Sequence, residues 1–403
     1  MQEKVKVLLL EWVSQVAVDA LKKNGFEHIE LLPNSLEWEE LLQKVADVDY
    51  IGIRSRTNIS KEVFLWAKNL KAVGCFCIGT NQVDTDYAME LWIPVFNAPF
   101  SNTRSVAELI IGETIMLLRG TFQRSNAAHA GEWLKNAKDS YEVRGKTIGI
   151  VGYGHIGTQV SVLAESMGMR VVYFDVVDKL PLGNAVKKET LEELLQEADI
   201  VTLHVPELPS TKNMMNEKMF SMMKQGSYFI NASRGSVVVI EELVACLQSG
   251  KIKWASIDVF PKEPKGKEEK FISPLQGMKN VILTPHVGGS TQEAQTNIGL
   301  EVAMKLVNYH KFGNTDGAVN YPQISLPAIK EGCRRVQFIH QNIPWMMAAI
   351  NKEFGDRGIQ IFAQFLDTKG SLGYAVLDVQ QITDEMVAEM QSIKGTIKLN
   401  FLN

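Results

Sequence analysis

The sequence predicts an α/β protein with two doubly wound parallel sheets and a small C-terminal βαββαβ unit, and three patterns support this fold class. Short apolar runs alternate with amphipathic stretches through residues 5–95, as strands and helices do in a parallel sheet. A G-x-G-x-x-G turn at residues 152–157 joins an apolar run to a helical stretch. Prolines at 322 and 327 then mark a linker before the last segment of the chain.

Length and composition limit the possible classes of protein. A chain of 403 residues exceeds the size at which a single core stops growing, so we expect two or three domains. Hydrophobic residues make up 45% and charged residues 22%, which is typical of a soluble globular protein. The net charge of −4 argues against a general affinity for nucleic acid or an anionic membrane.

Nothing in the pattern indicates a membrane span, a signal peptide or a metal site. The longest apolar run, residues 109–118, contains Glu113 and is far shorter than the roughly 20 residues that cross a bilayer. The first residues lack the features of a signal peptide, so we expect a cytoplasmic protein. The single residue between Cys75 and Cys77 does not match zinc-ligand spacing, so we expect no metal.

The predicted elements follow in order along the chain. In the first region, residues 5–10, 50–53 and 71–77 are predicted strands, and residues 16–24 and 38–45 are predicted helices. A long helix then begins near Ser101 or Thr103, either of which can cap it. Six further β-like runs predict a Rossmann-type sheet: residues 147–152, 170–174, 200–205, 227–231, 253–259 and 281–284.

The C-terminal segment has a pattern of its own after the linker at 321–332. Predicted strands at 334–339, 359–366, 374–379 and 396–402 alternate with predicted helices at 344–357 and 384–393. This order predicts a ferredoxin-like fold. A unit of about 70 residues commonly gains stability by pairing with a copy of itself.

The glycine-rich turn predicts a dinucleotide site. Gly152 permits the tight turn, Gly154 lets the backbone approach a pyrophosphate, and Gly157 allows the helix to pack against the strand. The helix N-terminus favours a diphosphate. Asp175 ends the next strand, where an acid receives ribose hydroxyls, and two valines rather than an arginine follow it. These features indicate NAD rather than NADP; the alternative is a glycine-rich turn without a ligand.

Three polar side chains follow later strands, at the edge where open α/β sheets bind ligands. His286 is the candidate base that takes the hydroxyl proton of an alcohol as hydride leaves. Glu263 is the candidate carboxylate that orients the imidazole, and Arg234 the candidate partner of a substrate carboxylate. Taken singly, each also has a structural explanation: an ion pair, a solvated loop acid and a strand-end histidine.

Together these motifs resemble a known family. Four motifs carry the resemblance: the turn with Asp175, the Asn-Ala-Ser-Arg-Gly box at 231–235, Asp-Val-Phe at 258–260 and Thr-Pro-His-Val-Gly-Gly at 284–289. In these motifs the chain resembles the D-isomer-specific 2-hydroxyacid dehydrogenases over about its first 320 residues. The resemblance implies a flavodoxin-like substrate domain from residues 1–101 and 290–320, and an NAD-binding domain from 102–289. It also implies that Arg234, Glu263 and His286 form the catalytic triad.

The resemblance further implies a set of cofactor contacts beyond the glycines and Asp175, with Asp258 near the nicotinamide amide. The additional contacts implied for NAD are His155, Ile156, His204, Pro206, Ala232, Ser233, Asp258, His286, Gly288 and Gly289.

Residues 51–57, 73–84 and 96–108 resemble family members that act on a phosphorylated hydroxy acid. Arg54 and Arg56 beside the Ser55 hydroxyl suit a phosphate dianion, although a network of ion pairs is the alternative. The resemblance implies that the backbone at Ile78 and Gly79 binds the substrate carboxylate. It also places two further residues near the substrate, Asn102 and Lys135.

The C-terminal segment, residues 333–403, resembles an ACT domain, a module that binds small amino acids, usually serine in this class of enzyme. The resemblance makes His340 and Asn342 effector candidates, with Gln360 where asparagine is usual. Trp345 replaces the usual glycine, so a purely structural role in dimerisation stays open. A homotetramer is expected from the family.

The expected function is therefore NAD-dependent oxidation of a phosphorylated 2-hydroxy acid. One alternative is a relative that acts on an unphosphorylated acid such as glyoxylate, hydroxypyruvate or 2-oxoglutarate. A second alternative, from a different class, is an NAD-sensing binding protein like the C-terminal-binding corepressors.

Overall fold

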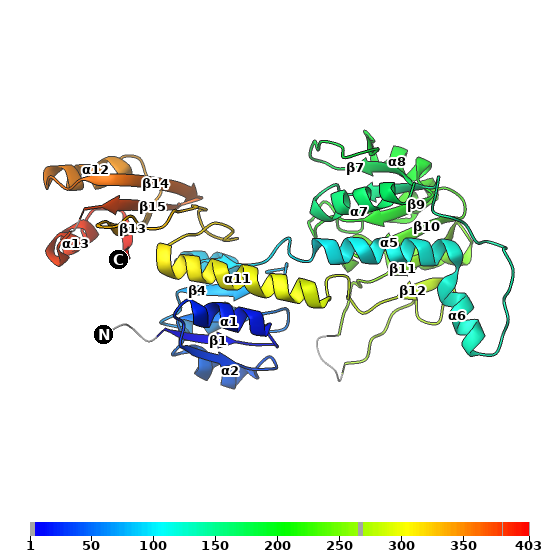
Figure 1. The fold of residues 1–403 in the computed structure, drawn as a ribbon, viewed down its shortest axis with the longest axis horizontal. Coiled ribbons are helices and arrows are strands. Elements are labelled where there is room, and N and C mark those ends of the chain that lie inside the picture. The colour runs from blue at the N-terminus through cyan, green and yellow to red at the C-terminus, as the bar shows by residue number, and fades with distance from the viewer. Residues whose placement is uncertain (1–4, 265–268, 381, 403) are drawn as a thin grey trace. The chain divides into compact units, whose positions relative to one another are not determined.

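The computed structural model describes residues 5–264, 269–380 and 382–402 (Figure 1). The chain forms two compact units: the first joins Met1–Ser101 to Gln295–Asn403, and the second is Asn102–Ala294. The predicted domain ranges also include residues 1–4, 265–268, 381 and 403, which lie outside the described part. No helix in the described part is long and apolar enough to span a bilayer.

The first unit contains a five-stranded parallel sheet in the order β2-β1-β3-β4-β5, the strand order of flavodoxin. Its strands are β1 (Lys6–Leu9), β2 (His28–Leu31), β3 (Tyr50–Ile53), β4 (Ala72–Cys75) and β5 (Val95–Phe96). Its helices are α1 (Gln15–Lys23), α2 (Trp38–Val45), α3 (Lys61–Trp66) and α4 (Thr85–Glu90). β2 is not among the predicted strands, because it is an edge strand without a fully buried residue.

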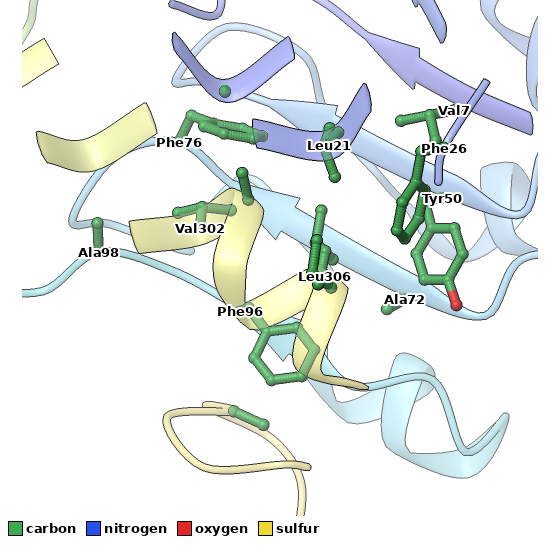
Figure 2. Packing of buried hydrophobic residues seen from close by; sticks show 14 of the residues in the cluster. Val7, Leu21, Phe26, Tyr50, Ala72, Phe76, Phe96, Ala98, Val302 and Leu306 are labelled. Carbon is green, nitrogen blue, oxygen red and sulfur yellow. The ribbon is translucent and has the colours of Figure 1, made fainter. Parts of the chain in front are cut away.

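A helix from much later in the chain completes the core of this sheet. Val302 and Leu306 of α11 (Gln292–Phe312) lie in one cluster with Phe76 and Phe96 (Figure 2). The approach is close, because a Cβ on Gly74 would lie 2.8 Å from Cγ1 of Val302. The first unit is therefore built from two distant parts of the sequence.

The second unit contains a seven-stranded parallel sheet in the order β12-β11-β10-β9-β6-β7-β8. Its strands are β6 (Thr147–Val151), β7 (Arg170–Phe174), β8 (Val186–Lys187), β9 (Ile200–Leu203), β10 (Ser227–Asn231), β11 (Ile252–Ile257) and β12 (Val281–Leu283). The predicted Rossmann-type fold is confirmed. The prediction of six strands was wrong by one, because the edge strand β8 has only two residues, too few for a periodic pattern.

Helices flank this second sheet: α5 (Thr103–Arg119), α6 (Thr121–His129), α7 (His155–Ser166), α8 (Leu191–Glu197), α9 (Glu217–Met222) and α10 (Ile240–Gln248). The predicted long helix is α5. Its N-cap residue is Asn102, whose side chain makes no capping hydrogen bond among the described residues, so the prediction that the N-cap is Ser101 or Thr103 was wrong.

The C-terminal segment forms an antiparallel sheet in the order β14-β15-β13-β16, which confirms the predicted βαββαβ unit. Its elements are β13 (Arg334–Gln341), α12 (Met346–Asp356), β14 (Ile361–Lys369), β15 (Leu372–Val379), α13 (Asp384–Gln391) and β16 (Thr396–Leu402). Pro344 precedes α12, whose N-cap is Trp345.

A buried ion pair joins this sheet to the rest of the first unit. Arg335 is fully buried and binds both carboxylate oxygens of Asp378, at 2.6 and 2.7 Å. The same guanidinium donates to the carbonyl oxygens of Phe312 at 3.1 Å and Pro327 at 3.0 Å. One side chain thus attaches the antiparallel sheet to the end of α11 and to the linker. The division of this unit into substrate and regulatory domains stays a prediction.

Candidate active site

The G-x-G-x-x-G turn follows β6 at the point where the order of the second sheet reverses, since β7 lies on one side of β6 and β9 on the other. Gly152 has a φ of +94°, and a Cβ there would lie 2.6 Å from the carbonyl oxygen of His204. A Cβ on Gly157 would lie 2.2 Å from the carbonyl oxygen of Gly152. Packing therefore requires glycine at both positions.

Gly154 is different, because apart from its two chain neighbours no atom of the described residues lies within 4 Å of the place where its Cβ would be. It is the N-cap of α7, and His155 and Ile156 are the first two residues of that helix. The backbone N–H groups of a first helical turn have no partners within the helix and attract anions. The open space at Gly154 is therefore suited to a diphosphate.

Asp175 follows β7 at the same edge of the sheet. Its carboxylate accepts the backbone N–H groups of Tyr153 at 2.7 Å and Val177 at 2.9 Å. The first bond connects the acid to the glycine-rich turn, and each oxygen keeps a further lone pair for a ribose hydroxyl. Val176 and Val177, where an arginine would neutralise a 2′-phosphate, are exposed apolar residues. These features fit NAD.

The next two strand ends carry other predicted cofactor contacts. His204 follows β9 with its Nε2 3.0 Å from the Thr202 hydroxyl, and burial lowers the pKa of this imidazole to about 3, so it is neutral at pH 7. Pro206 is exposed two residues later. After β10, the N–H and hydroxyl of Ser233 both donate to the side-chain oxygen of Asn231, which orders the turn at Ala232.

Asp258 follows β11 and organises the loop after β12. Its buried carboxylate accepts the Thr284 hydroxyl at 2.6 Å and the backbone N–H groups of Val287 at 2.8 Å and Gly288 at 2.9 Å. Its backbone carbonyl accepts the N–H of His286 at 2.8 Å. His286 itself has a φ of +54°, which is uncommon for a residue with a side chain.

The imidazole of His286 meets a carboxylate. Nδ1 of His286 lies 2.8 Å from Oε2 of Glu263, whose Oε1 accepts the N–H of Phe260 at 3.0 Å. The hydrogen bond to Glu263 raises the pKa of His286 above its usual value, although burial opposes this. Burial raises the pKa of Glu263, but the bonds to His286 and Phe260 outweigh it, so this pKa falls. Nε2 of His286 has no partner among the described residues, so it can bind a substrate.

Arg234 lies near this pair. A Cβ on the next residue, Gly235, would lie 2.0 Å from the carbonyl carbon of Phe260, so only glycine lets the two loops approach. The positive charge of Arg234 contributes to lowering the pKa of Glu263 and opposes the rise in the pKa of His286. Its guanidinium donates to the carbonyl oxygen of Ser233 at 2.7 Å and has no carboxylate partner in the described part of the chain. Its other N–H groups stay available to an anion.

Two predicted substrate neighbours in the second unit differ in placement. Asn102 lies against Gly289, where a Cβ would come 2.2 Å from the Asn102 amide nitrogen. The Asn102 side-chain oxygen is buried and has no hydrogen-bond partner within the described residues. Lys135 is exposed in the loop after α6, and no hydrogen bond or ion pair of the described residues joins it to the other candidates.

The predicted phosphate and carboxylate contacts lie in the first unit, after adjacent strands. Arg54, Ser55 and Arg56 follow β3, and in the described ranges neither guanidinium has a hydrogen-bond or ion-pair partner. The ion-pair network that was the alternative for these arginines is therefore not found among these residues. After β4, the Ile78 carbonyl accepts the side-chain amide of Asn97 at 2.5 Å, and Gly79 is open to a side chain.

The effector candidates lie on the antiparallel sheet. His340 is buried beside Gly373, where a Cβ would come 2.1 Å from the imidazole, and its Nε2 has no partner in the described part. Asn342 donates to the carbonyl of Gly370 at 3.1 Å. Gln360 is exposed one residue before β14. Trp345 has a φ of +67° and is half exposed, so it keeps the left-handed backbone of a glycine.

One buried acid near Asp258 is not among the predicted site residues. Glu113 on α5 is 1% exposed, and neither carboxyl oxygen has a hydrogen-bond partner among the residues that the structure describes. Burial raises its pKa to about 7 and the charge of Asp258 adds to this effect, although the nearby Ser256 hydroxyl favours the ionised form. The sequence feature that could have indicated a buried acid is the position of Glu113 inside the apolar run 109–118.

Comparisons with known proteins agree with this geometry. Residues 111–288 match the family described as D-isomer specific 2-hydroxyacid dehydrogenase, NAD binding domain. The sequence is 52% identical over 406 residues to the D-3-phosphoglycerate dehydrogenase of Escherichia coli K12, covering 100% of this chain and 98% of that protein. It is 50% identical over 402 residues to the enzyme of the same name from Haemophilus influenzae, with the same coverage.

Solved structures agree with the fold. The TT0316 protein of Thermus thermophilus is 30% identical with a TM-score of 0.68, covering 75% of this chain and 96% of that one. A D-lactate dehydrogenase from Aquifex aeolicus, complexed with NAD and lactic acid, is 26% identical with a TM-score of 0.66, covering 76% of this chain and 95% of that one.

The buried acid predicts a pH-dependent stability difference. Because the pKa of Glu113 is about 7 in the folded protein, against an ordinary value of 4.5, the unfolded chain loses this proton first as pH rises. The unfolding free energy therefore falls between about pH 4.5 and 7 and stays constant above, a loss of about 3 kcal/mol from this group. Glu113→Gln should remove that loss.

Urea unfolding of both proteins between pH 5 and 8.5 measures the effect. The variant should gain stability over the native protein as pH rises to 7, with little further gain above. A difference that does not depend on pH would show that Glu113 is ionised in the folded state.

Proposed function

The chain belongs to the D-isomer-specific 2-hydroxyacid dehydrogenases, and from that membership we propose that it oxidises D-3-phosphoglycerate to 3-phosphohydroxypyruvate with NAD. This is the first step of L-serine biosynthesis. The observation that carries the proposal is the His286–Glu263 pair with the unpaired Arg234 on the same sheet edge, in a chain about half identical over its full length to relatives of this name.

His286 is the proposed acid–base group. Oxidation of a secondary alcohol requires a base for the hydroxyl proton, and Nε2 of His286 can serve because Nδ1 is bonded to Glu263. The carboxylate stabilises the imidazolium that forms when Nε2 takes the proton. The raised pKa of His286 has the same physical origin, since Glu263 favours the charged imidazole.

The cofactor is NAD, which when bound supplies the nicotinamide that accepts hydride. The second unit offers what it needs: the open helix end at Gly154 for the diphosphate and the Asp175 carboxylate for the ribose. Gly288 and Gly289 lie beside Asp258 and Asn102 respectively and are proposed to border the nicotinamide. The neutral imidazole of His204 adds no charge at the same edge.

The substrate is proposed to use its two anionic ends. Arg234 binds the carboxylate and polarises the developing carbonyl. The carboxylate contact at Ile78 and Gly79 stays a prediction. Arg54 and Arg56, with the Ser55 hydroxyl, bind the phosphate. This role of the two arginines is supported because neither guanidinium is paired with an acid within the described ranges. Asn102 and Lys135 stay predicted neighbours of the substrate.

We also propose that the antiparallel sheet binds serine as an effector at His340 and Asn342, with Gln360 at its edge. The unpartnered Nε2 of the buried His340, within the described part of the chain, supports a polar ligand there. The left-handed backbone of Trp345 supports it too, because a conformation suited to glycine has been kept at the turn before α12. The homotetramer and the cytoplasmic location expected from the sequence stay predictions.

Replacing Arg54 tests the substrate class. Arg54→Ala should lower kcat/KM for D-3-phosphoglycerate about 10- to 100-fold, because a charged hydrogen bond to phosphate is lost. Oxidation of the unphosphorylated acid D-glycerate should change little. Arg104→Ala, which removes an exposed arginine already paired with Glu108, is the control.

Steady NADH absorbance gives both rates. If the native enzyme oxidises an unphosphorylated acid faster than D-3-phosphoglycerate, and Arg54→Ala leaves that rate unchanged, the enzyme acts on an unphosphorylated acid. If the native protein forms no NADH with any hydroxy acid, it is a binding protein.

Replacing Glu263 tests the proton transfer. In Glu263→Gln the carboxylate that raises the pKa of His286 is gone, so that pKa falls. The acid limb of the pH profile for oxidation should shift to lower pH while turnover falls, by up to about 10,000-fold. NADH binding measured by fluorescence should persist. An acid limb at its original pH would mean that another group takes the proton.

A serine titration tests the effector site. Millimolar serine should inhibit the native enzyme and raise its melting temperature, because a ligand that binds the folded state stabilises it. Asn342→Ala should lose both responses and keep its basal activity. Native enzyme that shows neither response has a C-terminal unit with a structural role only.

A further inference from the structure

A buried acid in the first unit takes no part in the proposed reaction. Glu11 follows β1, is 6% exposed, and uses both carboxylate oxygens on the backbone of another loop. Oε2 accepts the N–H of Arg56 at 3.0 Å, and Oε1 accepts the N–H of Thr57 at 2.7 Å. These two residues belong to the loop that carries the proposed phosphate contacts.

The backbone around Glu11 is unusual. Glu11 has a φ of +67° and Trp12 a φ of +54°, two consecutive left-handed residues without a glycine. Such conformations are sparsely populated by residues with side chains and persist where the surroundings hold them, often at functional sites. At Glu11 the holding contacts are the two hydrogen bonds to the loop after β3.

The sheet brings the two segments together. β1 and β3 are neighbouring parallel strands with Leu9 opposite Gly52, and the N–H of Leu10 donates to the carbonyl of Gly52 at 2.8 Å. The loops that follow both strands therefore leave the same edge. Glu11 meets Arg56 and Thr57 because of this register.

The other side of the loop is held by an amide. Nε2 of Gln82 donates to the carbonyl oxygen of Arg54 at 2.5 Å. The loop backbone is thus bonded at its start by Gln82 and at its end by Glu11, whereas the Arg54 and Arg56 guanidiniums have no partner in the described part of the chain. The backbone of the loop is therefore held by hydrogen bonds, whereas the two guanidiniums stay available to bind an anion.

We propose that Glu11 is a positioning residue for phosphate recognition: it holds the loop 54–57 in the conformation in which both guanidiniums bind the phosphate. The inference rests on the proposed function, since it needs Arg54 and Arg56 to be the phosphate contacts. Two like charges directed at one anion tend to separate in its absence, and a buried carboxylate bonded to the loop opposes that separation. A preorganised loop loses less conformational entropy when the substrate binds.

The test separates binding from chemistry. Glu11→Gln keeps the length of the side chain but places an amide NH₂ where one oxygen accepts an N–H, and Glu11→Ala removes both bonds. Both variants should raise KM for D-3-phosphoglycerate about 10-fold or more, with kcat within about twofold. Oxidation of D-glycerate should be unchanged, which a general structural defect would not allow.

Asp49→Asn is the matched control. The Asp49 carboxylate also accepts a backbone N–H, that of Lys6 at 2.8 Å. Asp49 precedes β3, however, so it lies at the amino ends of the strands and not at the carboxyl ends, where Glu11 lies. This variant should lower stability without changing KM for either substrate. Gln82→Ala removes the hydrogen bond to the Arg54 carbonyl and should also raise KM for D-3-phosphoglycerate. It replaces the Glu11 variants in this test if they fold poorly.

The outcomes distinguish the two proposals. If Arg54→Ala raises KM for the phosphorylated acid but the Glu11 and Gln82 variants do not, Glu11 has no positioning role. If Arg54→Ala also has no effect, the phosphate contacts themselves are wrongly assigned. In folded Glu11→Gln, faster hydrogen exchange at the amides of Arg56 and Thr57 should accompany the higher KM; exchange at the native rate would overturn the inference.

Discussion

The buried carboxylate of Asp258 is the interaction on which the candidate active site depends. It accepts one hydroxyl and two backbone N–H groups from the loop after β12, and its own carbonyl accepts the N–H of His286. These bonds hold His286 in a left-handed backbone conformation, with its imidazole on Glu263. Because an unpaired buried acid is costly, the loop can leave this arrangement only by giving up several bonds at once.

Acidic side chains accept backbone N–H groups of loops at other strand ends as well. Asp175 binds the glycine-rich turn, Glu263 binds the backbone after β11, and Glu11 binds the loop after β3, in each case through a backbone N–H. These acids thus hold the loops through backbone N–H groups, while Glu263 also binds His286 and Asp175 keeps lone pairs for a ribose. The arginines after β3 and β10 are left unpaired with acids in the described ranges, so a chain with a net charge of −4 still offers cationic sites for an anionic substrate.

In the C-terminal sheet, the buried acid is paired with an arginine. Arg335 and Asp378 are both buried, and the guanidinium donates to two backbone carbonyl oxygens as well as to both oxygens of Asp378. Removing one partner of such a pair costs about 3–5 kcal/mol. The sheet is therefore attached to the end of α11 and to the linker, whereas Trp345, a half-exposed residue, has a left-handed backbone conformation. A conformation of that kind is typical of a turn kept for a ligand.

Periodicity and local backbone needs were enough to predict the glycine turn and most strands and helices of the three sheets, but not the edge strands β2 and β8. The three catalytic candidates were predicted from polar residues that follow predicted strands and from a family resemblance. The tertiary structure alone decided which loops meet. The partners of Glu11 are 45 and 46 residues away and those of Asp258 up to 30, and strand register places them at one edge. It also decided the protonation of Glu113, since the pKa of an acid depends on the burial and charge around it, which no local pattern of residues contains.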